Sequence, residues 1–402
     1  MTRLGFVMEA GDTAYVGPGL YREQIVVQHD GTSASRITFV ADTTGQHTGD
    51  PPGVVMLAGS EPVDETLFTS RSAAGTYGAR LPYQVWGIVE MDGPQLRYVR
   101  AVTTDEHLVD SVSEPDVVAR LPSTFTVDPH TGELLLHTSD GRPPASHEIE
   151  IIERAAGIST QGQHFVTVVG FTFRHMQDAG VQFFKGSGDA IAVGNTAYGS
   201  RQGIRVYDAT NVVLQGNTLF RNENSGAYFA AASTSGVAIG NVAYENVKGL
   251  RWSSQSSDAL VLDNWCFDNR ERGISLENAD RALLRRNVLA GNAVSQLLVI
   301  QSAYGSESNC FERASPEQLA VDFRPFPPRA TYPTLADYQL AQHQDLHSRE
   351  GGCGPQPPKV DVGKLHADTL AYTERARRIL RGETPPAPPP PARSWLDRLL
   401  GR

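Results

Sequence analysis

The segments GIRVYDATNVVLQGNTLFRNENS (203–225) and GAYFAAASTSGVAIGNVAYENVK (226–248) decide the fold, because both are 23 residues long and follow one pattern. Similar segments begin at Gly157, Gly180, Gly203, Gly226, Gly249, Gly273 and Gln296. The spacing between these starts is 23 or 24 residues. A fixed period of this size is typical of solenoids, in which each repeat adds one coil to a stack.

Within each repeat, apolar and polar residues alternate with a period of two, which indicates β-strands. In GIRVYD, Ile204 and Val206 fall on one face, and Arg205 and Tyr207 fall on the other. Three strands of four to six residues, joined by turns, account for one repeat. Because a single coil cannot bury its own apolar face, the stack of coils must make the core. The sequence therefore predicts an all-β, single-stranded parallel β-helix with about 23 residues per coil.

Asparagine recurs at the same two places of successive repeats. The first column is Asn195, Asn217, Asn241, Asn264, Asn287 and Asn309, and the second is Asn222, Asn246, Asn269 and Asn292. Asparagine tolerates left-handed backbone, and its amide can bond to the same residue of the next coil. We expect amide ladders at the corners of the coils. A third column is predicted to be aromatic or aliphatic: Tyr198, Phe220, Tyr244, Phe267, Leu289 and Phe311.

Composition excludes several classes of protein. The 402 residues carry a formal net charge of −10, which argues against nucleic acid as the main partner. No apolar stretch is long enough for a transmembrane helix, and three Cys are too few for a disulfide-dense scaffold. The first residues show no basic segment followed by an apolar one, so no signal peptide is visible. Only two lysines, Lys185 and Lys248, lie in the repeats.

Breaks in the repeat predict how the chain is divided. We expect N-terminal coils in 1–60, an inserted β-rich subdomain in 61–150, and the main coils in 151–314. A C-terminal cap with short helices follows in 315–382, and a Pro-rich linker with an amphipathic tail in 383–402. In the insertion, 124–143 predicts a β-hairpin around DPHTG, and 83–88 and 96–99 are candidate strands.

The ends of the C-terminal region carry separate predictions. Thr334 is the expected N-cap of a short helix, and 364–381 fits a second helix. In the tail, Trp395, Leu396, Leu399 and Leu400 stand at helical spacing, which leaves open a docking segment, a disordered end, or an anchor to a partner or membrane surface. Whether Cys310 pairs with Cys353 stays open; such a pair would clip the cap to the last coil.

The outward-facing side chains of the coils are the candidates for function. Two residues after each leading position stand Ser159, Gln182, Arg205, Tyr228, Arg251 and Ser275; two further on stand Phe184, Tyr207, Ala230, Ser253 and Glu277. Aromatic faces can stack on sugar rings, and Arg can bind carboxylates with two parallel hydrogen bonds. These columns predict a surface for an acidic polysaccharide. Glu277 is the outward carboxylate of the two columns, and is our candidate for an acid or a metal contact.

The coil pattern G-[IVL]-x-[FVLW], followed by [VIL]-x-x-N-x-[FYL], resembles the right-handed parallel β-helix superfamily with the pectate-lyase-like fold. The run AGDTAYVGPGLYREQIVVQHDGTSASRITFVAD (10–42) is similar to the opening coils of chondroitinase-B-like and alginate-lyase-like members. The resemblance covers about 10–60 and 150–311. It implies a right-handed helix, action on a polysaccharide, and an extracellular or cell-surface location.

The resemblance also implies a reaction. β-Elimination and C5-epimerisation of a uronate both need a base at C5 and a cation, Ca²⁺ or Arg, that neutralises the carboxylate. The lyases that this chain resembles use a Lys and an Arg on neighbouring coils, and the corresponding positions here are Ala232 and Ser254. We therefore assign carboxylate neutralisation to Arg251 and Arg205, and proton transfer to Tyr228 or His175.

Two further patterns bear on chemistry. The run Asp128-Pro129-His130-Thr131 lacks the last acid of the D-P-H-D motif of alginate epimerases, and we interpret it as a turn. The clustered Asp motifs of polygalacturonase-type hydrolases do not occur in the sequence. No metal ligands are assigned. Two hypotheses remain: a lyase or epimerase, and a non-catalytic β-helix that binds glycans or serves as a scaffold.

Overall fold

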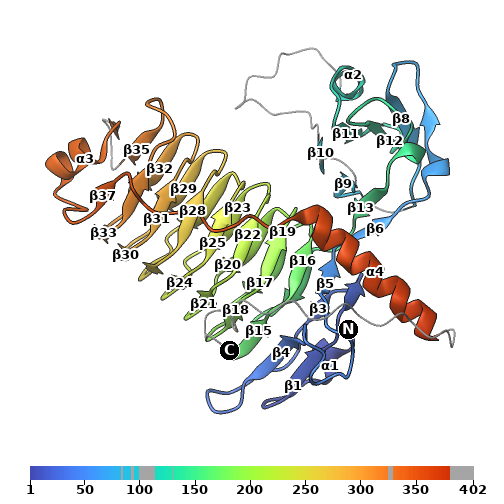
Figure 1. Cartoon of the computed structure of the whole chain (residues 1–402), viewed down its shortest axis with the longest axis horizontal. Coiled ribbons are helices and arrows are strands. Elements are labelled where there is room, and N and C mark those ends of the chain that lie inside the picture. The colour runs from blue at the N-terminus through green and yellow to red at the C-terminus, as the bar shows by residue number, and fades with distance from the viewer. Residues whose placement is uncertain (83–84, 92–94, 99–113, 129, 325–328, 381–402) are drawn as a thin grey trace.

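The computed structural model describes residues 1–82, 85–91, 95–98, 114–128, 130–324 and 329–380. Most of these form an elongated β-solenoid, with a separate β-subdomain beside its N-terminal end (Figure 1). Three long sheets run along the solenoid, each built from one strand per coil. The predicted parallel β-helix is confirmed.

Two of the three sheets are parallel throughout, and the third is parallel up to its last strand. Sheet A contains β1 (Thr13–Val16), β4 (Ile37–Ala41), β15 (Val166–Val169), β18 (Ile191–Val193), β21 (Val213–Gln215), β24 (Val237–Ile239), β27 (Leu260–Leu262), β30 (Ala282–Arg285) and β33 (Tyr304–Glu307). Sheet B contains β2 (Gly19–Tyr21), β5 (Val55–Ala58), β16 (Thr172–Arg174), β19 (Thr196–Tyr198), β22 (Thr218–Phe220), β25 (Val242–Tyr244), β28 (Trp265–Phe267), β31 (Val288–Ala290), β34 (Cys310–Glu312) and β37 (Arg349–Glu350).

The third sheet carries the candidate site. Sheet C contains β3 (Ile25–Val26), β14 (Ala156–Ser159), β17 (Ala179–Phe184), β20 (Gln202–Tyr207), β23 (Ser225–Ala230), β26 (Lys248–Ser253), β29 (Arg272–Glu277), β32 (Ser295–Ile300), β35 (Leu319–Arg324) and the antiparallel β36 (Ala330–Tyr332). In the coil that begins at β20, Ile204, Leu214 and Leu219 point inward from the three sheets and are fully buried in one core.

The two predicted asparagine ladders are present at the coil corners. Asn241 Nδ2 donates to Asn264 Oδ1 over 3.0 Å, and Asn264 Nδ2 donates to Asn287 Oδ1 over 3.0 Å. The second ladder ends at Gln296, whose Oε1 accepts from Asn292 Nδ2. Gln296 occupies the position that is glycine in earlier coils. A Cβ at Gly226 would lie 2.7 Å from the Gly249 carbonyl oxygen, so a side chain is excluded inside the stack.

The inserted subdomain is an eight-stranded sheet with its own core. In sheet order its strands are β6 (Ser60–Pro62), β13 (Ile149–Ile152), β9 (Gly87–Glu90), β10 (Gln95–Tyr98), β11 (Thr124–Val127), β12 (Leu134–His137), β8 (Thr76–Ala79) and β7 (Thr69–Ser70). The strands β11 and β12 pair antiparallel, which confirms the predicted hairpin. Of the other predicted strands, the region 83–88 overlaps β9, but residues 83–84 and 99 lie outside the described residues. The helix α2 (Glu114–Arg120) packs on β11 and β12.

The C-terminal region folds back along the solenoid. The helix α3 (Leu335–Gln342) begins at the predicted N-cap Thr334, and its Leu335 and Tyr338 extend the main core. A disulfide joins Cys310 in β34 to Cys353, with 5.6 Å between the Cα atoms. Residues 354–361, here called the strap, lead from this disulfide to α4 (Val362–Leu380), which packs against β2 of the first coils (Figure 1). The short helix α1 (Leu4–Val7) covers β3.

An aromatic ladder on sheet B lies under this returning segment. The rings of Tyr198, Phe220, Tyr244 and Phe267 stack with centroids 5.0–5.2 Å apart. Val360, Val362 and Leu365 pack against this ladder, and the Val360 N–H donates to Tyr244 Oη over 2.8 Å. The predicted aromatic or aliphatic column was wrong in its last two members, Leu289 and Phe311. The register pairs Phe267 with Ala290, because Leu289 and Phe311 occupy the neighbouring strand position that faces the core.

We predict that Asn264→Ala destabilises the whole stack. The fully buried Asn264 accepts from the backbone N–H and the amide of Asn241 and donates to the Ala238 carbonyl oxygen. Each buried group left unpaired costs about 1–3 kcal/mol, so the free energy of unfolding should fall by at least about 2 kcal/mol. Thermal and urea unfolding would measure this. Gln215→Ala, at an exposed position of β21, is the matched control and should change stability by less than about 0.5 kcal/mol. Equal effects of the two changes would contradict a structural role for the ladder.

Candidate functional site

The outer face of sheet C brings the two predicted columns together. The strand register places Gln182, Arg205, Tyr228 and Arg251 side by side on four successive coils, and pairs Phe184 with Tyr207 and Ser253 with Glu277. Adjacent coils are about 4.8 Å apart. The columns therefore form one continuous surface, with a new pair of outward residues at each coil.

Several members of the columns are less accessible than predicted. Ser159 and Ser275 are fully buried, and Gln182 and Ser253 are 6% and 4% exposed. Ser275 stands between Arg251 and Leu298 of the neighbouring coils, and these longer side chains flank its hydroxyl. Alternation alone distinguishes inward from outward positions, but it does not show which outward side chains their neighbours cover.

A carboxylate holds two cations at the centre of the face. Glu277 accepts hydrogen bonds from Arg251 Nε (3.1 Å) and Nη2 (2.6 Å), and from Lys248 Nζ (2.9 Å). Burial raises the pKa of Glu277, but the hydrogen bond from Arg251 and the charge of Lys248 outweigh it, so the pKa lies below its ordinary value. Glu277 is thus ionised at neutral pH and fixes both cations in place.

Tyr228 completes this central group. Its ring lies 4.9 Å from the Arg251 guanidinium, and its hydroxyl is hydrogen-bonded to the Ser253 hydroxyl over 3.0 Å. Arg205, one coil away on the other side of Tyr228, is ion-paired with Asp178 and lies 4.4 Å from the Tyr207 ring. Gln182 Nε2 also donates to Asp178. The two arginines of the predicted site are therefore held in fixed positions on both sides of Tyr228.

Lys248 is the residue that the sequence analysis left out of the site. It begins β26, two positions before Leu250, and its column contains Gln202, Ser225 and Arg272. Period-two alternation places Lys248 on the same side as the core residue Leu250, and Gln202 and Ser225 of this column are buried. The Lys248 side chain is nevertheless partly exposed and reaches Glu277. The signal that could have identified Lys248 is its rarity, because it is one of only two lysines in the repeats.

His175 lies away from this face, so its predicted role in proton transfer is not supported by its position. Its ring is buried at the junction of β16 with the inserted subdomain, 3.5 Å from Ser60 Oγ and 3.9 Å from Glu150 Oε2. Burial lowers the pKa of His175, although Glu150 opposes this effect. The fully buried Glu150 is also paired with Arg22 and Arg174. His175 is part of a structural polar cluster at this junction.

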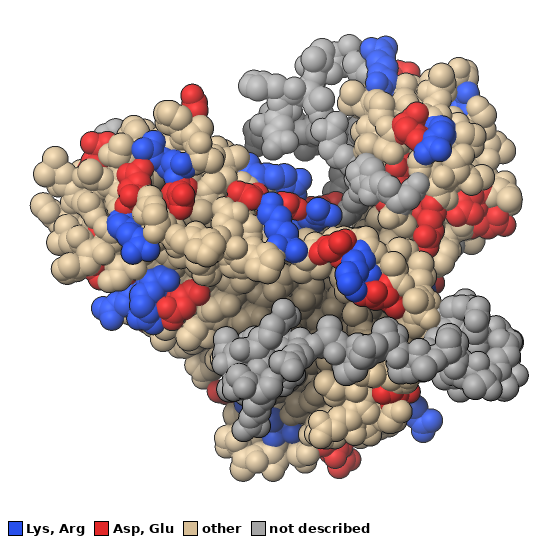
Figure 2. All heavy atoms as spheres, viewed as in Figure 1, with Lys and Arg blue, Asp and Glu red and all other residues tan. Residues whose placement is uncertain are grey.

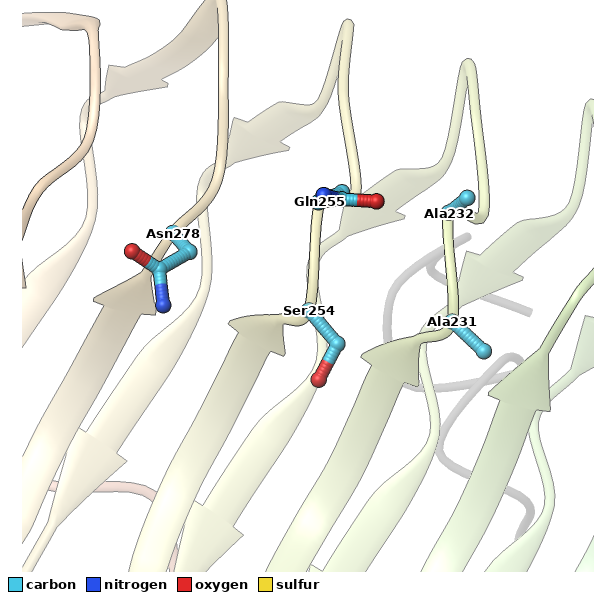
Figure 3. A pocket seen from close by; sticks show the side chains of 5 residues that line it. All are labelled: Ala231, Ala232, Ser254, Gln255 and Asn278. Atoms are coloured by element: carbon cyan, nitrogen blue, oxygen red, sulfur yellow. The ribbon is translucent and has the colours of Figure 1, made fainter.

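An open depression of about 660 Å³ adjoins Ser253 and Glu277. It is lined by Ala231, Ala232, Ser254, Gln255 and Asn278, from the turns that follow β23, β26 and β29 (Figure 3). Ala232 and Ser254 are the two positions at which the resemblance implied Lys and Arg. The hollow is therefore lined by small side chains, with one hydroxyl and two amides that can bond to neutral hydroxyl groups of a ligand.

The ionised groups of the face are largely paired, with a small excess of cations on an acidic protein. The strands of sheet C contain five cations (Arg205, Lys248, Arg251, Arg272 and Arg324) and two carboxylates (Glu277 and Asp322). Asp178 and Glu271, next to the strands, pair with Arg205 and Arg272, which leaves a net charge of +1 against −10 for the whole chain. Cationic and anionic side chains are intermixed along the upper part of the solenoid in Figure 2. Among the described residues, no group of three or more His, Cys, Asp or Glu side chains could hold a metal ion, so we assign no residue to Ca²⁺.

Two remaining sequence features have structural explanations. Asp128 accepts from the backbone N–H groups of His130 and Thr131, which confirms that this run is a hairpin turn; Pro129 lies outside the described residues. Within the part of the chain that the structure describes, no helix combines the length and the apolar character needed to cross a membrane.

Comparisons with known proteins support the architecture. Residues 156–311 match the family model described as "Right handed beta helix region". No curated protein matches the sequence. The solved complex of XylC with xylose has 14% identity and a TM-score of 0.53, over 81% of this chain and 66% of that chain. At this identity the likeness shows the fold alone.

Two further solved structures resemble the chain more weakly. The periplasmic alginate epimerase AlgG has 20% identity and a TM-score of 0.36, over 42% of this chain and 46% of that chain. The mannuronan C-5 epimerase AlgE4 A-module of Azotobacter vinelandii has 14% identity and a TM-score of 0.42, over 78% of this chain and 68% of that chain. The chain spans just under two thirds of the length of XylC and less than half of AlgG.

We predict that Glu277 makes stability pH-dependent. The pKa of this carboxyl is lowered in the folded protein, so its contribution is complete above the unfolded value of about 4.3 and is lost as pH falls through the lower folded value. Glu277→Gln should therefore lower the melting temperature near neutral pH, and the difference from the natural chain should shrink in acid. Glu9→Gln, at an exposed position, is the control. A difference that does not change with pH would contradict this assignment.

Proposed function

Because the repeats of this chain form a parallel β-helix and residues 156–311 match a model for right-handed β-helices, we propose that the sheet C face binds an acidic, uronate-containing polysaccharide. The observation that carries the proposal is the outward row of Arg205, Tyr228 and Arg251 on three successive coils. A polysaccharide is itself a repeating chain, and a surface that presents cations and an aromatic ring at regular intervals can contact several sugars at once.

The charges and the hollow support complementary contacts. The hydrogen bonds to Glu277 use Nε and Nη2 of Arg251, which leaves Nη1 for the carboxylate of a ligand. Lys248 adds a second cation beside it. Gln255 and Asn278 line the adjoining hollow and can bond to sugar hydroxyl groups. A uronate unit offers a carboxylate and several hydroxyl groups together, and therefore suits both parts of this surface.

The reaction that we propose is β-elimination or C5-epimerisation at Tyr228. Both begin when a base removes the C5 proton and the electron pair moves into the neighbouring carboxylate, whose added charge Arg251 would balance. In elimination the electrons then expel the C4 oxygen, which takes up a proton and leaves a C4–C5 double bond. In epimerisation a proton returns to C5 from the opposite face. The Tyr228 hydroxyl, flanked by Arg205 and Arg251, is the candidate group for proton transfer.

A specific observation favours a second function, non-catalytic glycan binding. Ala232 and Ser254 occupy the positions at which the resemblance implies a catalytic Lys and Arg, and neither can act as a base or neutralise a carboxylate. Arg205 and Arg251 are also already paired with Asp178 and Glu277. Each of these arginines is thus already held by a carboxylate of the protein. Such a surface can bind a glycan reversibly without performing a reaction.

We predict that Arg205→Ala combined with Arg251→Ala weakens binding to uronate polysaccharides such as alginate and pectate. Each charge-assisted hydrogen bond contributes about 1.5–3 kcal/mol, so loss of even one such contact should reduce affinity about 10- to 100-fold. Calorimetry or affinity electrophoresis would measure this. Arg286→Ala is the matched control, because Arg286 is also ion-paired but lies at an exposed turn after β30. Undiminished binding by the double variant to every acidic glycan tested would reject the proposed surface.

Tyr228→Phe separates the two functions. If Tyr228 transfers the proton, this change should strongly reduce the rate of product formation and leave binding nearly intact. Ultraviolet absorbance of unsaturated uronates and NMR of epimerised units would measure the products. The expected loss of rate is about 100-fold or more. A natural chain that binds the polysaccharide but forms no product in either assay would favour the non-catalytic function.

A further inference from the structure

The outer face of sheet A is aliphatic, unlike the outer faces of the other two sheets. The register aligns Ile191, Val213, Val237, Leu260 and Leu283 in one outward column. These side chains are partly exposed, with Leu260 at 40%, whereas the alternate residues of the same strands are buried in the core. Val193, Ile239 and Leu262 extend the face in a parallel column, which Gln215 and Arg285 interrupt. A contiguous aliphatic face of this kind marks an interaction surface.

The described helices pack elsewhere. The helix α1 contacts β3, α3 contacts β35 and β36, and α4 contacts β2, so these helices cover strands of sheets B and C. The aromatic ladder of sheet B is covered by the strap and the start of α4. Sheet A, at the lower edge of the solenoid in Figure 1, has an apolar outer face without a comparable cover among the described residues.

The end of α4 shows which segment can reach this face. Tyr372 lies beside Gly53, which in turn lies beside Pro18, the residue that links β1 of sheet A to β2 of sheet B. The chain therefore leaves the solenoid at a corner of sheet A. The helix continues for eight residues to Leu380, about 12 Å, and residues 381–392 are a Pro-rich linker of about 37 Å when extended.

The reach of the linker matches the position of the face. After the helix has carried the chain about 12 Å outward, about 25 Å of linker remains for the return. The strands β18, β21 and β24 are the third, fourth and fifth neighbours of β1, at about 14–24 Å. In residues 393–402, helical spacing would place Trp395, Leu396, Leu399 and Leu400 on one side.

We propose that the C-terminal segment 393–402 docks as a short amphipathic helix on the outer face of sheet A, over Ile191, Val213 and Val237. A ten-residue helix is marginal on its own in water and gains stability when an apolar surface covers its apolar side. Because the tail is tethered, its effective concentration at this face is in the millimolar range, well above that of a second copy of the chain at ordinary concentrations. The tail is thus an intramolecular cover for the one apolar sheet face that the described helices leave open.

Cross-linking in the full-length chain tests the docking site. A variant that carries Val213→Cys and Leu399→Cys should form an intramolecular disulfide under mild oxidation, identified by mass spectrometry of the peptides. The matched control carries Lys185→Cys and Leu399→Cys, with the partner cysteine at an exposed turn after β17 of sheet C. We expect cross-linking in the first variant at least tenfold faster than in the control. Equal rates in the two variants, or cross-links between two chains, would overturn the proposal.

Deletion of 383–402 gives an independent test. The uncovered face should bind a hydrophobic dye several-fold more strongly than the full chain does, and Val237→Asp in the deleted chain should reverse the gain. The full chain should be monomeric by light scattering. A full-length dimer that Val237→Asp disrupts would assign the face to a second copy. The full chain could instead bind anionic vesicles in a manner that depends on Trp395, while the deletion leaves dye binding unchanged. That outcome would assign the tail to a membrane. Either result overturns the proposal.

Discussion

The register between successive coils is the constraint on which the rest of this structure depends. In a parallel stack, each residue faces its equivalent on the next coil at about 4.8 Å, so a feature repeated in sequence becomes a continuous line in space. The amides of Asn241, Asn264 and Asn287 bond to one another because of this register, and they also resist its loss. A slip of one residue would break these buried bonds and turn every core side chain outward.

The same register builds the candidate site. Lys248 and Arg251 are brought to Glu277 of the next coil, which neutralises part of their charge and holds their side chains still. An arginine that is already ordered loses less conformational entropy when it binds a ligand. The ion pairs therefore have two effects on the surface. They reduce the repulsion between neighbouring cations, and they orient the remaining hydrogen-bond donors toward solvent.

Prediction from the sequence succeeded wherever the period of the repeat was sufficient. The neighbours Arg205, Tyr228 and Arg251 and the two Asn ladders follow from spacing and alternation, whereas the hairpin of the insertion follows from its turn residues. The position of His175 could not be predicted in this way, because its burial depends on Glu150, which the inserted subdomain contributes. Lys248 was missed for a different reason: alternation places it on the side of the core residue Leu250, and only the length of its side chain lets it reach Glu277.

The strap changes how the stack can come apart. Coils that touch only their neighbours can separate from either end, one at a time. Here the last coil is joined through Cys310 and Cys353 to the strap, and the strap leads to α4 on the first coils. The two ends of a linear stack are thereby fastened to each other along its outside. The last coil can unfold only after the strap has separated from the aromatic ladder. Unfolding that begins at the C-terminal end is therefore opposed by contacts made along the whole solenoid.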